Sequence, residues 1–113
     1  MNKKIIIFMI LLSIYFLLNG VKEEPDDLIY HYQIGKISAL SGKFTIEGIN
    51  SLELYISQEN DNANPSKSAA CWRLGLIYEK INDPDKAKES YERGFQLGPE
   101  DGYCHEALGQ LKN

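Results

Sequence analysis

The most informative segment of the sequence for the fold is Leu74-Gly75-Leu76-Ile77-Tyr78, which is followed by a break at Asn82-Asp83-Pro84 and a second break at Gly98-Pro99. Apolar residues before the first break recur with the 3.6-residue period of an α-helix: Ala69, Ala70, Leu74, Ile77, Tyr78 and Ile81. Gly75 falls in the middle of this predicted helix, where glycine costs about 1 kcal/mol relative to alanine. We therefore expect a neighbouring helix to approach closely at Gly75.

A second helix is expected directly after this break. Asp83 is a favourable N-cap, and Pro84 suits the first helical position, where its missing N–H is not needed. Its apolar face is predicted to carry Ala87, Tyr91 and Phe95, with Leu97 as a further candidate. Gly98 should end the helix in a left-handed cap, and Pro99 prevents its continuation.

The same pattern recurs along the chain. Leu74-Gly75 returns as Leu108-Gly109 after 34 residues, and Ile34-Gly35 stands 40 residues before it. The six extra residues fit a lengthened polar loop over 58–65. A repeat of this length predicts an all-α fold of stacked antiparallel helix pairs, an α-solenoid.

The repeat resembles the tetratricopeptide repeat (TPR) family, whose pattern runs W-x2-L-G-x2-Y, then A-x3-F, then P. Here Leu74-Gly75-x2-Tyr78, Ala87-x3-Tyr91 and Pro99 follow it with the expected gaps, although Trp72 comes one residue late and Gly94 replaces the usual alanine. The Sel1-like repeat has a similar core and is the alternative, with nearly the same architecture.

Five helices are predicted in a repeat domain over residues 26–113, at 26–41, 43–57, 66–81, 84–97 and 101–112. Residues 26–57 form a degenerate repeat that turns at Ser41-Gly42, and 66–99 form a well-matched one. The second helix of the degenerate repeat is predicted to bury Phe44, Ile49, Leu52 and Ile56. Residues 101–112 form a capping helix, with Tyr103, Ala107, Leu108 and Leu111 facing inward and Glu106, Gln110 and Lys112 facing water. Because about three repeats are usually needed for stability, two and a half favour a partner, a dimer or a membrane anchor.

The N-terminus is expected to lie outside this domain. Lys3 and Lys4 precede an apolar run over residues 5–18, which is too short to span a bilayer comfortably but suits a signal peptide. We expect residues 1–20 to be cleaved near Gly20, with 21–25 as a linker and the domain exported to the periplasm or secreted. The alternative is an uncleaved inner-membrane anchor with the domain facing outward. Cleavage would remove both lysines and change the formal charge from −4 to −6, which disfavours nucleic acid as a partner.

No motif for catalysis or a cofactor is present, and we expect neither an enzyme nor a metal site. His31 and His105 are interpreted as partly exposed helix residues. Cys71 and Cys104 are 33 residues apart, on corresponding turns of successive first helices. Export would permit a disulfide between them, whereas burial as small apolar residues is the stronger interpretation.

The TPR resemblance implies a concave groove that holds a peptide or helix from another protein. Transferred by position, the groove residues are Tyr32, Lys36, Trp72, Leu76, Glu79, Glu106 and Gln110. Trp72 is placed first because aromatic side chains dominate interface energies, although it could instead fill the repeat core. Few basic residues face this groove, which argues against a clamp for C-terminal carboxylates. The predicted function is a non-catalytic scaffold of the cell envelope; the alternative is a structural subunit that completes a homodimer or larger repeat assembly.

Overall fold

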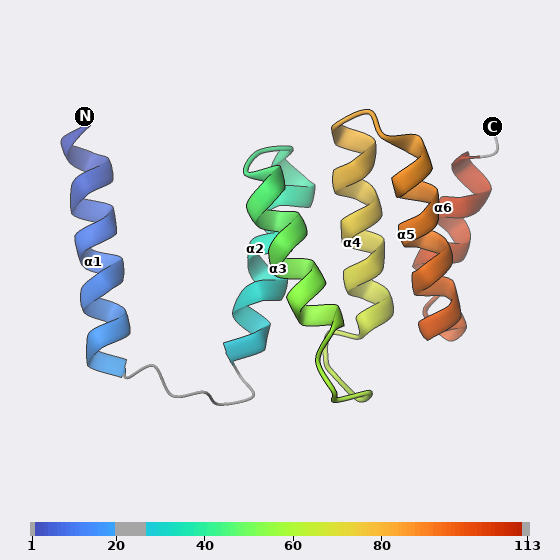
Figure 1. The fold of residues 1–113 in the computed structure, drawn as a ribbon, viewed down its shortest axis with the longest axis horizontal. Helices are drawn as coiled ribbons and strands as arrows, with labels where there is room; N and C mark the ends of the chain where they lie inside the picture. The colour runs from blue at the N-terminus through green and yellow to red at the C-terminus, as the bar shows by residue number, and fades with distance from the viewer. Residues whose placement is uncertain (1, 20–26, 112–113) are drawn as a thin grey trace.

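The computed structural model describes residues 2–19 and 27–111, which form six α-helices and one short 3-10 helix (Figure 1). These elements are α1 (Lys3–Asn19), α2 (Asp27–Ser41), α3 (Thr45–Ile56), α4 (Lys67–Lys80), α5 (Pro84–Leu97), η1 (Pro99–Asp101) and α6 (Tyr103–Leu111). The described ranges contain no β-strand. The predicted all-α class is therefore confirmed.

Helices α2 and α3 form one antiparallel pair, α4 and α5 form the next, and α6 begins a third (Figure 1). The first helices of successive pairs touch, α2 with α4 and α4 with α6, and α3 also packs on α4. This is the stacking expected of helix-pair repeats. The polar segment between α3 and α4 is held by Tyr55, whose hydroxyl donates a hydrogen bond to the carbonyl of Pro65.

The central pair begins at side-chain caps. The Ser66 hydroxyl accepts the Ala69 N–H at 3.0 Å at the start of α4, and the Asp83 carboxylate accepts the Lys86 N–H at 3.2 Å at the start of α5. Asn82, between the two helices, has a φ of 61°, in the left-handed region that asparagine tolerates better than most residues. These local signals explain why α5 begins at the predicted residue.

The end of α5 differs from the prediction. Gly98 has a φ of −158°, so it is not the left-handed cap that we expected. A Cβ atom at this position would lie 3.0 Å from the Cβ of Ser68. Gly98 therefore serves close packing against α4, and the chain continues into η1 before Gly102, with a φ of 80°, leads into α6.

Glycines in the first helices allow the second helices to come close. A Cβ on Gly35 would lie 2.1 Å from Leu52 Cγ, and a Cβ on Gly75 would lie 2.2 Å from Tyr91 Cε1. The expected packing role of Gly75 is thereby confirmed. Gly109 holds the equivalent position in α6, where a Cβ would meet nothing within 4 Å.

Several predicted core residues are exposed instead. Phe95 and Leu97 on α5 are 40% and 50% exposed, and α5 buries Ala87, Ser90, Tyr91 and Gly94. Gly94 carries the α5 contact because it lies against Cys71 and Cys104, where a side chain would not fit.

Two more corrections concern helix ends. Phe44 is 69% exposed with a φ of 55°, because it caps α3 from outside the helix. Ile81 is 44% exposed because it lies beyond the last residue of α4. On α3, Leu52 and Ile56 are buried as predicted, and Tyr55 joins them.

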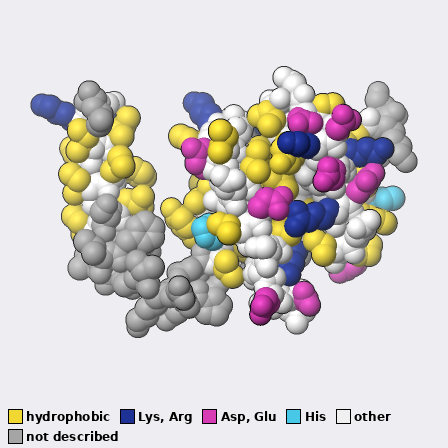
Figure 2. Space-filling view, in the orientation of Figure 1, with side chains coloured by type: hydrophobic (Ala, Val, Ile, Leu, Met, Phe, Trp, Pro, Cys, Tyr) yellow, Lys and Arg dark blue, Asp and Glu magenta, His cyan; other side chains and the backbone are white. Residues whose placement is uncertain are grey.

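Helix α1 makes no contact with the other described helices, and its apolar side chains from Ile5 to Leu12 are exposed (Figure 2). Among the residues described, none of the helices combines the length and hydropathy that crossing a membrane requires. The expected cleavage site at Gly20 and the linker over 21–25 lie outside the described residues, as does Lys112.

Candidate functional site

A hollow of about 190 Å³ lies between α4 and α6, and we call it the α4–α6 groove. It is lined by Trp72, Leu76, Glu79, Tyr91, Tyr103, Glu106, Ala107 and Gln110. Five of the seven residues that the TPR resemblance selected therefore line one surface. Tyr91, Tyr103 and Ala107 were not selected as groove residues, since the sequence pattern pointed to packing roles for them.

Trp72 lies at the centre of an aromatic and cationic cluster. Its ring stacks on Tyr103 of α6 with centroids 4.8 Å apart and planes at 25°, and the Arg73 guanidinium carbon lies 4.4 Å from the Trp72 ring centroid. Trp72 is half-buried, and it also packs on the core cluster of α5 and α6. The indole thus stabilises the α4–α6 contact while one part of it remains accessible in the groove.

Cys71 explains why the tryptophan is displaced. It stands at the position where the TPR pattern has its tryptophan, and its side chain is fully buried. A Cβ on Gly94 of α5 would lie only 2.9 Å from the Cys71 Cβ, so this site has room for cysteine but not for an indole. The next residue, Trp72, consequently projects toward the groove.

The floor of the groove contains a buried phenol. Tyr91 is fully buried, and its hydroxyl donates a hydrogen bond to the Glu79 carboxylate at the groove surface. Burial raises the pKa of Tyr91 well above its ordinary value, and the hydrogen bond to Glu79 and that residue's negative charge raise it further. The groove therefore presents carboxylates from Glu79 and Glu106 beside apolar surface from Trp72 and Leu76.

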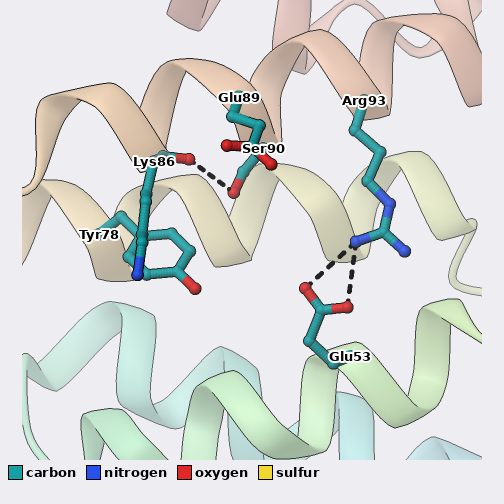
Figure 3. Close-up of a pocket in the computed structure, with 6 residues that line it drawn as sticks. All are labelled: Glu53, Tyr78, Lys86, Glu89, Ser90 and Arg93. Atoms are coloured by element: carbon teal, nitrogen blue, oxygen red, sulfur yellow. Dashed lines mark hydrogen bonds and ion pairs between the residues drawn. The ribbon is translucent and has the colours of Figure 1, made fainter.

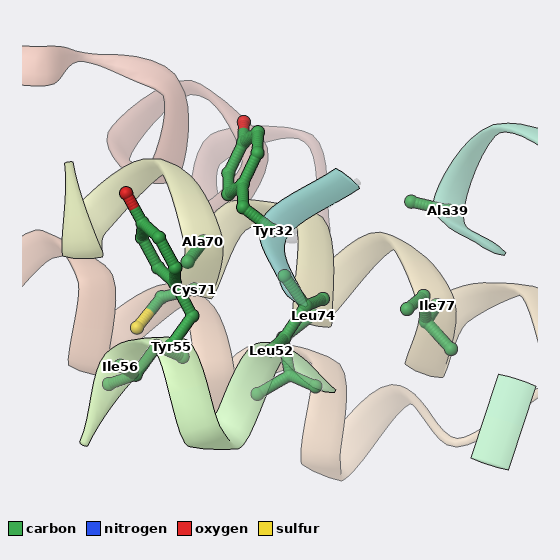
Figure 4. Packing of buried hydrophobic residues seen from close by; sticks show 9 residues of the cluster. All are labelled: Tyr32, Ala39, Leu52, Tyr55, Ile56, Ala70, Cys71, Leu74 and Ile77. Carbon is green, nitrogen blue, oxygen red and sulfur yellow. The ribbon is translucent and has the colours of Figure 1, made fainter. Parts of the chain in front are cut away.

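The two predicted groove residues on α2 do not line this hollow. Tyr32 is only 6% exposed and packs in the core, with its ring centroid 5.4 Å from that of Tyr55 (Figure 4). Its hydroxyl accepts a hydrogen bond from Arg73 Nε at 3.4 Å. Lys36 is half-buried on α2 and lies outside the lining. Tyr32 fails as a groove residue because it packs inward against α3.

A separate hollow of about 120 Å³ lies between α3 and α5 (Figure 3), and no sequence pattern had predicted a site there. Arg93 of α5 donates two hydrogen bonds, of 3.1 and 3.0 Å, to the carboxylate oxygens of Glu53 on α3. Nearby, Lys86 Nζ lies 5.7 Å from the Tyr78 ring centroid. The ion pair between Arg93 and Glu53 joins α5 to α3, so we interpret the hollow as part of the contact between successive second helices.

Both cysteines are free and buried, and the disulfide that export would permit is not formed in the structure. Cys104 Sγ donates a hydrogen bond to the Ser68 carbonyl at 3.5 Å. Burial raises the pKa of the Cys71 thiol to about 12 and also raises that of Cys104. A thiol held in its neutral form is a poor nucleophile and a poor metal ligand.

No three His, Cys, Asp or Glu side chains within residues 2–19 and 27–111 gather closely enough to hold a metal ion. His31 is half-buried on α2, and His105 is exposed on α6 with its ring 5.7 Å from that of Phe95.

Stacked helix pairs with close-packed glycines and a groove between first helices define a helical-repeat protein. Residues 68–101, which span most of α4 with α5 and η1, match the tetratricopeptide repeat family. This region of the chain is therefore one tetratricopeptide repeat. No curated protein and no solved structure gives a significant match to the chain. Repeats of this family are non-catalytic and generally mediate protein–protein interaction.

Proposed function

We propose that the protein is a scaffold of the cell envelope that holds an apolar or mixed peptide, or a helix of another protein, in the α4–α6 groove. The observation that carries this proposal is the convergence of Trp72, Leu76, Glu79, Glu106 and Gln110 on one surface. A half-buried tryptophan beside apolar surface is typical of a protein-binding hot spot.

Export is part of the proposal. Residues 1–20 would act as a signal peptide or, if uncleaved, as an inner-membrane anchor with the repeats facing outward. The exposed apolar side chains of α1 and its lack of contact with the repeats support a targeting or anchoring role. N-terminal sequencing of the protein from its native host tests this: a mature chain beginning at Val21 supports cleavage, and an intact Met1 supports the anchor.

Site-specific photocrosslinking tests the groove. A photoreactive residue at Leu76, inside the groove, is expected to capture a discrete partner in the native host. The same residue at Leu54, which is 54% exposed on α3, is the matched control and is expected to capture none. Equal crosslinking from both positions would contradict groove binding.

Trp72→Ala is expected to reduce this crosslinking about tenfold or more, since truncation of a hot-spot tryptophan removes 2 kcal/mol or more of binding energy. Far-UV circular dichroism should show nearly unchanged helicity, because Trp72 is only half-buried. If the helical signal collapses in the variant, Trp72 is a core residue and the groove assignment fails.

A structural role in a homodimer is the second candidate, and an exposed apolar stripe on α2 favours it. Ile29, Ile37 and Leu40 follow helical spacing and are 43%, 58% and 64% exposed. The hydrodynamic mass of residues 21–113 separates the two roles. A monomer supports the interaction scaffold, whereas an obligate dimer that Leu40→Asp dissociates supports the structural role.

A further inference from the structure

A glycine in the first helix of each pair is covered by a side chain of the second helix in two pairs, and the corresponding glycine of α6 is uncovered. Gly35 is covered by Leu52 of the following helix, and Gly75 is covered by Tyr91 of the following helix. Gly109 holds the same position in α6 and is covered by nothing within 4 Å. A glycine costs up to about 1 kcal/mol relative to alanine in a helix, and at Gly109 no close contact with another helix offsets this cost.

Two hollows that share Leu108 lie beside this glycine, and together we call them the end groove. One has a volume of about 180 Å³ and is lined by Phe95, His105, Leu108 and Gly109. The other has a volume of about 320 Å³ and is lined by Lys88, Glu92, Leu108 and Leu111. Leu108 and Leu111 are half-buried and Phe95 is 40% exposed, so the end groove offers apolar surface along α5 and α6.

The preceding repeat indicates which charge a helix bound in the end groove should carry. Leu52 and Tyr91 are equivalent, since each covers the glycine of its own pair. Glu53 and Glu92, the residues that follow them, are therefore equivalent as well. Glu53 receives Arg93 from the next second helix at 3.0 Å. Glu92 lies in the end groove, where its contact with Lys88 is a solvent-exposed pair at 3.9 Å.

We infer that the end groove is a docking site for an amphipathic helix of a partner protein. This helix would place a large apolar side chain on Gly109 and a basic side chain, two residues later, against Glu92. The Tyr91-Glu92-Arg93 sequence of α5 shows the same arrangement on Gly75 and Glu53. The end groove and the α4–α6 groove share no lining residue, so binding at one does not depend on binding at the other.

A folded second copy of the chain does not present this pair of residues on an exposed helix. On α2 the exposed residues Ile29, Ile37 and Leu40 are followed two positions later by His31, Ala39 and Gly42, none of which is lysine or arginine. The apolar residues of α3 and α5 that would fit, Leu52 and Tyr91, are fully buried within their own pairs. Helix α1 is apolar beyond Lys4 and carries no basic residue within its apolar run. The described residues of the chain therefore contain no candidate for this occupant.

The probe is a labelled synthetic peptide of residues 82–98, the chain's own copy of the required helix, titrated with the full chain in a non-ionic detergent. A version stapled between positions 85 and 89, which are exposed in α5, holds the peptide helical. Fluorescence anisotropy should show saturable binding. Absence of binding by the stapled peptide would overturn the inference.

Variants of the full chain identify the binding surface. Gly109→Leu is expected to fold normally, since it meets open space, and to weaken peptide binding about tenfold or more by filling the groove. Asn50→Leu, which adds the same side chain to the exposed surface of α3, is the matched control and should leave the Kd unchanged. If Gly109→Leu leaves the Kd of the peptide unchanged, the peptide replaces α5 on α4. That result would overturn the assignment of the peptide to the end groove.

A charge exchange tests the pairing at Glu92. The peptide change Arg93→Glu should weaken binding about tenfold, and Glu92→Lys in the chain should restore it. If Glu92→Lys does not restore binding of the Arg93→Glu peptide, the predicted pairing of the basic side chain with Glu92 is wrong. Self-association of the chain without peptide, abolished by Gly109→Leu, would instead assign the groove to a second copy and overturn the partner assignment.

Discussion

Gly75 and Gly109 occupy the same position in successive repeats, yet their surroundings differ. Gly75 lies under the ring of Tyr91, whereas Gly109 faces open space. The role of a glycine in a helical repeat therefore depends on whether the second helix of its own pair is present.

This contrast predicts opposite effects of substitution on stability. Gly75→Leu should lower the free energy of unfolding by about 1–3 kcal/mol or more, because the tyrosine ring and helix backbone must move apart. Gly109→Ala should raise it by about 0.5–1 kcal/mol through helix propensity alone. Urea denaturation of both variants checks the pair, and an unchanged midpoint for Gly75→Leu would contradict the packing register.

At the scale of elements, the helix ends show how far the sequence could predict the fold. The ends of α5 depend on local residues, Asp83-Pro84 and Gly98-Pro99, so they could be located without tertiary information. The start of α6 could not, because η1 takes up Pro99–Asp101 and delays the helix to Tyr103. Helical type followed from periodicity, whereas the exact ends also depend on how the chain packs after each break.

The groove residues also show what the sequence could and could not predict. On α4 and α6 the repeat register selected Trp72, Leu76 and Glu79, and in the structure these three residues line one hollow. On α2 the repeat is degenerate, and Tyr32 packs on Tyr55, a contact that the family pattern does not contain. Periodicity also failed for Phe95, because Gly94 carries the close contact and a glycine adds no hydrophobic signal.

The N-caps of the central pair give an element-scale prediction. The Ser66 hydroxyl accepts the Ala69 N–H and also donates to the Asp101 carboxylate, joining α4 to η1. The Asp83 carboxylate caps the start of α5 with one hydrogen bond and does not join it to another element. Asp83→Ala should cost about 1 kcal/mol of stability. Ser66→Ala should cost about 0.5–1.5 kcal/mol more, because the second hydrogen bond is also lost. Chemical denaturation that gives equal losses would contradict the joint role of Ser66.

At the scale of the whole molecule, buried ionisable groups set the response to alkaline pH. The pKa of Cys71 is raised from 9.0 to about 12 by burial, and the pKa values of Cys104 and Tyr91 are raised as well. These groups ionise earlier in the unfolded chain than in the folded one. Their stabilising effect is therefore complete below about pH 8 and is lost as the pH rises above 9.

We expect the free energy of unfolding to fall above pH 9, with a slope that approaches about 1.4 kcal/mol per pH unit for the Cys71 thiol and a further fall of the same sign from Cys104. Urea denaturation between pH 7 and 10.5 measures this decline. The control is Cys71→Ala, which removes one titrating group and should reduce the slope by that amount. A slope that the substitution leaves unchanged would mean that Cys71 is accessible to solvent in the folded protein.

The buried residues form two clusters, one over α2, α3 and α4 and one over α5 and α6, and Tyr78 packs against both. Helix α6 has only nine residues and buries just Cys104 and Ala107. Transient opening of the protein should therefore begin at α6, where amide hydrogens would exchange with solvent well before those of α4. Each such opening would uncover the Cys104 sulfur, so the rate at which a thiol reagent labels this cysteine would measure how often α6 detaches from the repeats before it.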